Sequence, residues 1–269
     1  FRRVLFRSVY CVATGFGGNN ENIALLKHVT GFDAGKSISY FYFPLGNMDN
    51  TPQIIGSMSK TDDKKLLSLL TTDKEIKKFV EISSAEYIHG INIIKRFSSL
   101  CSVLEICKFV NSNSKSDKTF VDFADIYLDD MITGIFDLRS LGSSFEGAQT
   151  LMYLINGSIR GINSYIKRLI DTVRITLKKN DLKASKTKIV LAWTMDTNEI
   201  RADKIEMLKS LSSKLRDYIG DVETAEDGAN TFFSDKTTII VACSATDYKK
   251  IQEIEKDQEI GRASCRERV

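Results

Sequence analysis

Residues 120–131, FVDFADIYLDDM, decide how the rest of the chain is interpreted. They follow a Ser-, Asn- and Lys-rich loop at residues 111–119 and open an apolar-periodic stretch. This change predicts a helix start that carries Asp122 and Asp125 in its first turn. Acidic side chains there can cap free backbone N–H groups and favour the helix dipole, or they can aim two anions at one ligand. The context decides between the two.

The two ends of the chain differ in composition from the rest. Residues 1–8 and 261–269 are rich in Arg, lack periodicity and resemble translated adapter read-through more than protein. They hold six Arg and one Glu, so the chain between them has 32 Lys and Arg against 34 Asp and Glu. This balance predicts neither nucleic acid nor an anionic membrane as a partner.

The composition indicates a soluble protein of the cytoplasm. Hydrophobic residues make up 42% of the chain, enough for one large domain or two small ones with real cores. We find no apolar run of about 18 residues and no signal peptide, so no membrane span is expected. Cysteines in apolar stretches without CxxC spacing fit a reducing compartment. Only His28 and His89 are present, and we therefore predict no metal site.

A glycine loop follows the first apolar segment. Residues 9–13 predict a strand, residues 14–20 (TGFGGNN) a loop, and the apolar positions from Ile23 to Val29 a helix. Such a loop lets backbone N–H groups approach a phosphate, but many glycine turns need only a positive φ. Residues 31–37 (GFDAGKS) are not a P-loop, because three residues separate the glycines where the motif needs four.

Further along, the pattern alternates between strands and helices, which predicts an α/β fold. A dense apolar period over residues 85–111 predicts a long, central, buried helix. The expected strands are 38–43 (parallel to 9–13), 132–138, 188–193 and 237–243, and the expected helices include 64–70, 74–82, 145–159, 162–177 and 202–219.

Several stretches resemble one family in one order. Residues 13–18 (ATGFGG) look like the first half of the glycine-rich phosphate loop of the FtsZ/TubZ branch of the tubulin superfamily. Residues 121–125 (VDFAD) are similar to its NxDFADV synergy loop, and residues 143–148 (SSFEGA) resemble its SGEDRA run. Phe120 replaces the Asn of the synergy loop, and residues 19–22 (NNEN) replace the second half of the glycine loop.

The resemblance implies a partial Rossmann-like GTPase domain, a long central helix and a smaller C-terminal α/β domain with a mixed sheet. The implied boundaries are 9–118 for the end of the GTPase domain with the central helix and 119–258 for the C-terminal domain, with 1–8 and 259–269 as adapter artefacts. The chain would be a fragment that lacks the family's N-terminal nucleotide-binding loops.

The resemblance also implies a function. The protein would bind GTP/GDP with Mg²⁺, polymerise head to tail with itself, and hydrolyse GTP at the subunit interface. Such a cytoplasmic filament would serve cell division or plasmid segregation, without direct contact to nucleic acid. The implied catalytic residues are Asp122 and Asp125, and the implied nucleotide-binding residues are Gly15, Gly17, Gly18, Asn19 and Asn92; Asp49 is a weaker ribose contact.

Two alternatives stay open. The altered residues 19–22 are compatible with a non-hydrolysing filament or scaffold protein of the same fold. A von Willebrand A-like binding module would also combine strands with acidic turns, but its Asp-x-Ser-x-Ser metal motif is not present in the sequence.

Overall fold

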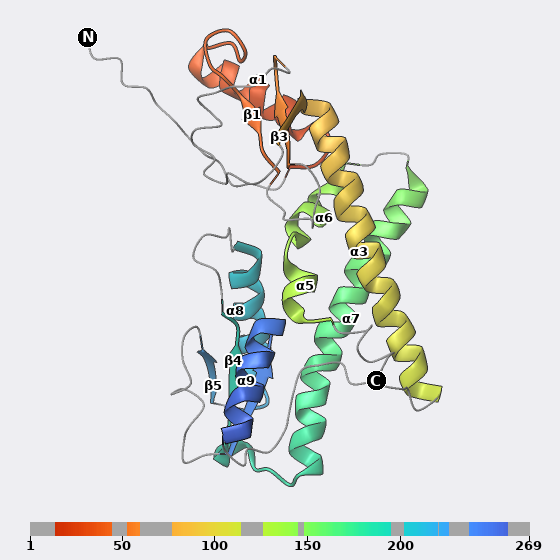
Figure 1. The fold of residues 1–269 in the computed structure, drawn as a ribbon, viewed down its shortest axis with the longest axis vertical. Helices are drawn as coiled ribbons and strands as arrows, with labels where there is room; N and C mark the ends of the chain where they lie inside the picture. Colours follow the sequence, from red (N-terminus) through yellow and green to blue (C-terminus); the bar gives the residue numbers. More distant parts are fainter. Residues whose placement is uncertain are drawn as a thin grey trace, which may run out of the picture. The chain divides into compact units, whose positions relative to one another are not determined.

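The computed structural model describes residues 14–44, 53–59, 77–113, 126–144, 148–194, 202–219, 221–225 and 237–257 (Figure 1). The chain divides into two compact units. Unit 1 comprises Phe1–Ile93 and Phe136–Leu151, and unit 2 comprises Ile94–Ile135 and Met152–Val269. The domain boundaries expected from the sequence stay a prediction.

Unit 1 contains a small mixed sheet with the strand order β1-β2-β3. The first two strands are antiparallel, and β2 is parallel to β3. The sheet is formed by β1 (Phe41–Tyr42), β2 (Gln53–Ser57) and β3 (Lys77–Glu81). The helical residues of this unit come from α1 (Gly18–Thr30), the start of α3 (Ile82–Asn113), α6 (Ile135–Gly142) and the start of α7 (Gln149–Lys179).

Two expectations for this region were wrong. The predicted helix over 74–82 was wrong, since its described part forms β3. A five-residue segment such as KKFVE is too short to distinguish the hydrophobic period of a helix from that of a strand. The strand expected at 38–43 forms only at β1, where its partner is β2 in antiparallel orientation. Residues 9–13, its expected partner, lie outside the described residues.

Unit 2 contains a parallel sheet with the order β5-β4-β6. The central strand β4 is buried along its whole length, and Ile189 pairs with Val222 on one side and Ile239 on the other. The elements of this sheet and its flanks are β4 (Thr187–Ala192), α8 (Ala202–Arg216), β5 (Val222–Ala225), β6 (Thr237–Ala242) and α9 (Ala245–Asp257); the 3-10 turn η1 (Ala184–Lys186) precedes β4. The strands predicted at 188–193 and 237–243 and the helix predicted at 202–219 are confirmed.

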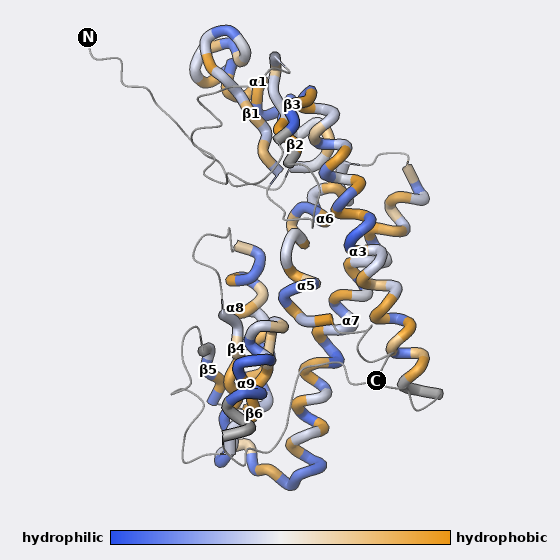
Figure 2. Tube along the Cα trace, viewed as in Figure 1, coloured by the Kyte–Doolittle hydropathy of each residue, from blue (hydrophilic) through white to orange (hydrophobic). Residues whose placement is uncertain are grey.

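The long helix predicted over 85–111 is confirmed as α3. The two helices expected at 145–159 and 162–177 are instead the continuous helix α7, along which apolar and polar residues alternate in short blocks (Figure 2). Gly161 lies inside α7 where a Cβ would come within 3.0 Å of the Cys101 sulfur, so its missing side chain permits close packing on α3. The glycine thus allows α7 and α3 to approach each other closely, and it does not end α7.

The prediction of a strand at 132–138 was also wrong. The region forms the short helix α5 (Leu128–Ile132) followed by α6. Ile132, Ile135, Leu138 and Leu141 are all buried, with a spacing of three residues that only a helix places on one side. The mixture of apolar residues with Thr133 and Gly134 concealed this period in the sequence.

The structure confirms an α/β fold with a small mixed sheet and a small parallel sheet. It lends no support to a GTPase domain specifically. Among the described residues, none of the helices is both long enough and apolar enough to cross a membrane.

Candidate functional site

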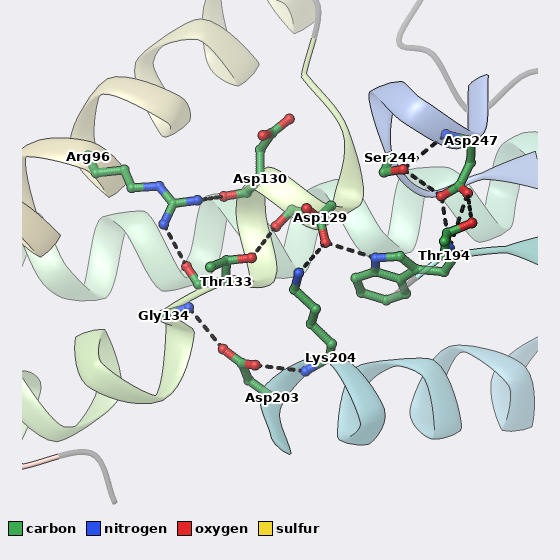
Figure 3. A network of polar contacts seen from close by, with 11 residues as sticks. Arg96, Asp129, Asp130, Thr133, Gly134, Thr194, Asp203, Lys204, Ser244 and Asp247 are labelled. Atoms are coloured by element: carbon green, nitrogen blue, oxygen red, sulfur yellow. Dashed lines mark hydrogen bonds and ion pairs between the residues drawn. The ribbon is translucent and has the colours of Figure 1, made fainter. Parts of the chain in front are cut away.

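The carboxyl edge of the parallel sheet in unit 2 has the topology of a ligand site. The chain passes from β4 to β5 on one side and then crosses to β6 on the other, so the strand order reverses between β4 and β6. In open α/β sheets, ligands bind outside the carboxyl ends of the strands at such a switch point. Here the two strands end at Ala192 and Ala242, and the residues that follow them form a connected polar network (Figure 3).

Asp247 joins the ends of the two strands. Its carboxylate is 3% exposed and accepts hydrogen bonds from the Thr194 backbone N–H (3.1 Å) and the Thr194 hydroxyl (2.6 Å). The Ser244 hydroxyl also donates to this carboxylate and accepts from the Asp247 backbone N–H at 3.1 Å, as a helix N-cap does. The acceptor positions of Asp247 are therefore largely used within the protein.

Asp129 connects α5 to the same edge. Its carboxylate accepts a hydrogen bond from the Trp193 indole N–H at 2.8 Å and lies 2.9 Å from the Lys204 ammonium. Its backbone N–H donates to the Cys243 carbonyl at 2.9 Å. Lys204 is only 5% exposed, and a buried ammonium needs such an anion close by.

The C-terminal end of α5 is also fixed. The Arg96 guanidinium donates to the carbonyls of Asp130 (2.8 Å) and Thr133 (2.9 Å), where the helix terminus leaves carbonyls without helical partners. The Asp203 carboxylate accepts from the Gly134 backbone N–H at 2.9 Å. The short helix is thus held against α8 and the sheet edge by charged side chains on several sides (Figure 3).

The edge carries one exposed cation beside the Asp247 carboxylate. In the first turn of α9, the Asp247 backbone N–H donates to the Ser244 hydroxyl at 3.1 Å and the Tyr248 backbone N–H to the Ser244 carbonyl at 3.0 Å. Lys250, which is exposed, places its ammonium 3.3 Å from the Thr194 hydroxyl. Within the part of the chain that the structure describes, there is no group of three or more His, Cys, Asp or Glu side chains that could hold a metal ion.

The residues expected to bind phosphate lie at the start of α1, and an internal carboxylate occupies their N–H groups. Glu86 accepts from the backbone N–H groups of Gly17 and Asn19, both at 3.0 Å, and from the Asn19 side-chain amide at 2.7 Å. Glu86 is 4% exposed. Gly15 packs against Ser140 and Ser144, and Gly18 against Thr14.

The other predicted site residues are separate from this cluster or not described. Asn92 is half-buried on α3. Asp122 and Asp125, like Asp49, lie outside the described residues, so their placement stays a prediction.

A second buried polar cluster lies in unit 1. The His89 Nε2 atom is 3.3 Å from an Asp137 carboxylate oxygen, and the ring of Tyr42 meets the His89 ring edge-on with centroids 6.4 Å apart. Burial raises the pKa of Tyr42 well above its ordinary value, and the nearby carboxylates of Asp137 and Glu86 act in the same direction. Tyr40 donates to the Asn19 side-chain oxygen at 2.7 Å, and burial raises its pKa as well.

The sequence interpretation missed the residues at the sheet edge. Ser244-x-x-Asp247 directly after an apolar strand matches a capping-box pattern, which could have marked the start of α9. Thr194 could also have been found, because it directly follows the strand predicted at 188–193. Asp129 and Lys204 carry no local signal, since their ion pair joins residues far apart in the chain.

Comparisons with known proteins bear on the fold. No protein-family model matches the chain, and no curated protein matches it in sequence. A solved UDP-D-ManNAc dehydrogenase from Pyrococcus horikoshii matches 91% of this chain with a TM-score of 0.54 and 13% identity. The chain spans 64% of the length of that protein. At this identity the match defines the fold class alone.

Two further solved structures are also nucleotide-sugar dehydrogenases by name. A UDP-N-acetyl-mannosamine dehydrogenase from S. aureus matches 86% of the chain and 59% of its own length, with a TM-score of 0.46 and 12% identity. An NDP-N-acetyl-D-galactosaminuronic acid dehydrogenase from Methanosarcina mazei Go1 matches 86% and 58%, with a TM-score of 0.45 and 12% identity. Both TM-scores are below 0.5, so the comparison of folds depends on the first structure.

These findings overturn the resemblance to the FtsZ/TubZ branch. The structural neighbours are dehydrogenases, so the GTP-hydrolysing filament, its cell-division or plasmid-segregation role, and the cofactors GTP/GDP and Mg²⁺ were wrong. The alternatives, a non-hydrolysing filament or a von Willebrand A-like module, have no support, and neither does head-to-tail polymerisation. Short glycine and acidic motifs occur in many folds. Here the backbone N–H groups of the glycine turn donate to the Glu86 carboxylate.

Proposed function

We propose that this chain is part of an oxidoreductase of the nucleotide-sugar dehydrogenase class and that the carboxyl edge of β4 and β6 binds the nucleotide of its substrate. The observation that carries the proposal is the switch point between these strands in a chain whose fold matches a UDP-sugar dehydrogenase over 91% of its length. The activity of the whole protein is part of the proposal, because the chain spans 64% of that structure.

The Lys250 ammonium, which lies beside Thr194 near the start of α9, would attract the diphosphate of such a ligand. Asp247 and Ser244 would position this helix start and would not bind the ligand themselves, since their hydrogen bonds are made within the protein. Lys250 is therefore the residue we assign to ligand binding.

A dehydrogenase of this class would transfer a hydride to NAD⁺. The start of α1 does not fit the pyrophosphate of that cofactor, because the Glu86 carboxylate takes the N–H groups of Gly17 and Asn19. We therefore assign none of the described residues to NAD⁺ and derive no catalytic step through it.

The test is a thermal-shift and calorimetric titration of the full chain with UDP-N-acetylmannosamine, UDP, NAD⁺ and GTP. Saturation to 100 times Kd would stabilise the folded state by about 2.7 kcal/mol, which is a readily measured shift. We expect the UDP compounds to stabilise the protein and GTP to have much less effect. Equal stabilisation by GTP and UDP, or by none of the four, would contradict the proposal.

A matched pair of variants localises the site. Lys250→Ala should weaken UDP binding by about tenfold, because one charge-assisted contact is lost. Lys249→Ala removes the same charge from the neighbouring exposed position of α9, which points in another direction, and should leave the affinity within about twofold. Equal effects of the two substitutions would indicate a non-specific charge effect and would exclude the assigned site.

A further inference from the structure

The solvent face of α7 gathers positive charge in a chain that is otherwise balanced. Residues 9–260 hold 32 Lys and Arg against 34 Asp and Glu, whereas α7 alone holds six Lys and Arg against the single Asp171. Most apolar residues of α7 are buried, so its charged residues face solvent. Five of the six cations are exposed, namely Arg160, Lys167, Arg174, Lys178 and Lys179.

Four of these cations form one line along the helix, the basic stripe. Arg160, Lys167 and Arg174 follow one another at steps of seven residues, which is nearly two turns. Lys178 follows four residues later, and at about 1.5 Å per residue the stripe is about 27 Å long. All four belong to unit 2, and none of them makes an ion pair with any described residue, including the half-buried Asp171.

The helix dipole accounts for only part of the stripe. Cations in the last turn, such as Lys178 and Lys179, are favoured by the negative end of the dipole. Arg160 and Lys167 lie more than two turns before that end, where the effect has fallen off. Their charges therefore form a surface that attracts an external anion.

An apolar side chain and an aromatic ring lie among the cations at the C-terminal end of the stripe. Ile175 is 61% exposed and lies beside Lys178 and Lys179, which follow it by three and four positions on the helix. Tyr218 is 46% exposed, and the Arg174 guanidinium lies 5.8 Å from its ring centroid. An aliphatic side chain among cations fits the boundary between lipid headgroups and acyl chains, where tyrosine is also favoured. Against a nucleic acid, Ile175 would face phosphates and water.

We propose that the basic stripe, together with Ile175 and Tyr218, docks the protein on the surface of an anionic membrane. A row of cations along one helix fits a flat anionic surface, because all four can reach the same plane. The cations contact lipid phosphates, and Ile175 enters the headgroup layer without spanning the bilayer. The contact is peripheral, and it is independent of the proposed ligand site on α9.

The test is flotation of the full chain with lipid vesicles. Vesicles of phosphatidylcholine with about one third phosphatidylglycerol should bind the protein, and vesicles of phosphatidylcholine alone should not. Raising the salt concentration from about 0.1 M to about 0.5 M should release most of the bound protein, because salt screens exposed charges. Binding to neither kind of vesicle, or equal binding to both, would overturn the proposal. Tighter binding to an oligonucleotide than to the anionic vesicles in the same buffer would also overturn it, since the stripe would then recognise nucleic acid.

A matched pair of charge variants localises the surface. Lys167→Ala combined with Lys178→Ala should weaken partition into anionic vesicles about 25-fold, because each lost cation weakens it about fivefold. Lys209→Ala combined with Lys249→Ala removes the same charge from exposed positions of α8 and α9, and should weaken partition less than about threefold.

The apolar contact has its own matched pair. Ile175→Ser should weaken binding to anionic vesicles about fivefold, because part of an apolar side chain no longer leaves water. Ile205→Ser makes the same change on α8, at a position that is 43% exposed, and should leave binding unaltered. Circular dichroism of each variant checks that the helices are retained. Equal losses within either matched pair would show that the stripe and Ile175 are not the docking surface.

Discussion

Glu86 and Asn19 are joined by two hydrogen bonds, although 67 residues separate them: one Glu86 oxygen accepts from the Asn19 backbone N–H at 3.0 Å and from its side-chain amide at 2.7 Å. The carboxylate lies where the dipole of α1 is positive, which favours an anion. This pair closes the start of α1 from inside the protein. It also explains why a phosphate-loop interpretation of residues 14–20 did not succeed.

Glu86→Gln should loosen the start of α1. The substitution turns one acceptor into a donor that faces a backbone N–H, and it should cost about 1 to 3 kcal/mol because a buried donor loses its partner. Hydrogen exchange of residues 14–30 should accelerate in this variant. Glu206→Gln, the same change at an exposed position of α8, is the control and should leave that exchange unaltered. Unchanged protection of the Gly17 and Asn19 amides in Glu86→Gln would show that the carboxylate does not hold them.

Asp129→Ala should destabilise unit 2. It removes the carboxylate 2.9 Å from the buried Lys204 ammonium and the acceptor of the Trp193 indole. We expect a loss of about 3 kcal/mol, at the lower end for a broken buried pair because the Asp129 side chain is 30% exposed. Trp193 is the single tryptophan of the chain, so its fluorescence during urea unfolding reports directly on this contact.

Two further variants test the explanation for Asp129. Asp217→Ala, at an exposed position after α8, should change stability by less than about 0.5 kcal/mol. Combining Asp129→Asn with Lys204→Met removes both charges and should recover much of the lost stability. If the double variant is less stable than Asp129→Asn alone, the ion pair is not the cause.

Gly90→Ala should be destabilising despite the better helix propensity of alanine. A Cβ at this position would lie 2.5 Å from Cζ of Phe16, and that ring is packed on Tyr87 with centroids 5.2 Å apart. Overpacking of this kind costs about 1 to 3 kcal/mol, which exceeds a propensity gain of about 1 kcal/mol. Chemical denaturation of the variant measures the difference.

Gly157→Ala makes the same substitution where space is free. Gly157 lies on the exposed side of α7, and nothing lies within 4 Å of the added Cβ. We expect a gain of about 0.5 to 1 kcal/mol from the lower entropy of the unfolded chain. Opposite signs for the two glycines would confirm that packing, and not propensity, determines the first.

Stability should fall as the pH rises above about 10, the ordinary pKa of tyrosine. Burial raises the pKa of Tyr42 in the folded state, so the unfolded chain loses this proton first and binds fewer protons in that range. Folding is then penalised as the pH increases. Burial also raises the pKa of the Cys101 thiol, which adds a decline of the same sign that begins at lower pH.

Tyr42→Phe isolates the tyrosine contribution. The variant should show a flatter decline of unfolding free energy between about pH 9 and 11, because phenylalanine has no hydroxyl group to titrate. Tyr87→Phe, at a position that is 56% exposed, should retain the slope of the natural chain. If the unfolding free energy declines equally in the natural chain and in both variants, groups other than Tyr42 determine the loss of stability at alkaline pH.

Long, strongly patterned elements could be predicted from the sequence, and this accounts for α3, β4 and β6. Each of them buries one face or both faces against many residues, so its apolar pattern is regular. Short elements could not be predicted, because β3 and α5 have five residues each, fewer than a period needs to be recognised.

The candidate site could not be predicted from the sequence for a different reason. Its contacts join residues such as Asp129 and Trp193, 64 positions apart, and a local pattern carries no information on such pairs. The sheet order β5-β4-β6 is likewise a tertiary property. Conversely, the resemblance to a GTPase depended on motifs of a few residues, which did not determine the surrounding fold.

The position of β4 in its sheet has a consequence for synthesis. This strand leaves the ribosome before either neighbour, and its second partner is complete only when Ala242 has been made, 50 residues after the end of β4. At ordinary translation speeds this interval lasts roughly 3 to 10 seconds. During that time an apolar strand has two open edges that can pair with other nascent chains. Recovery of the folded protein should therefore improve with slower, cooler expression, which lowers the number of such chains present together.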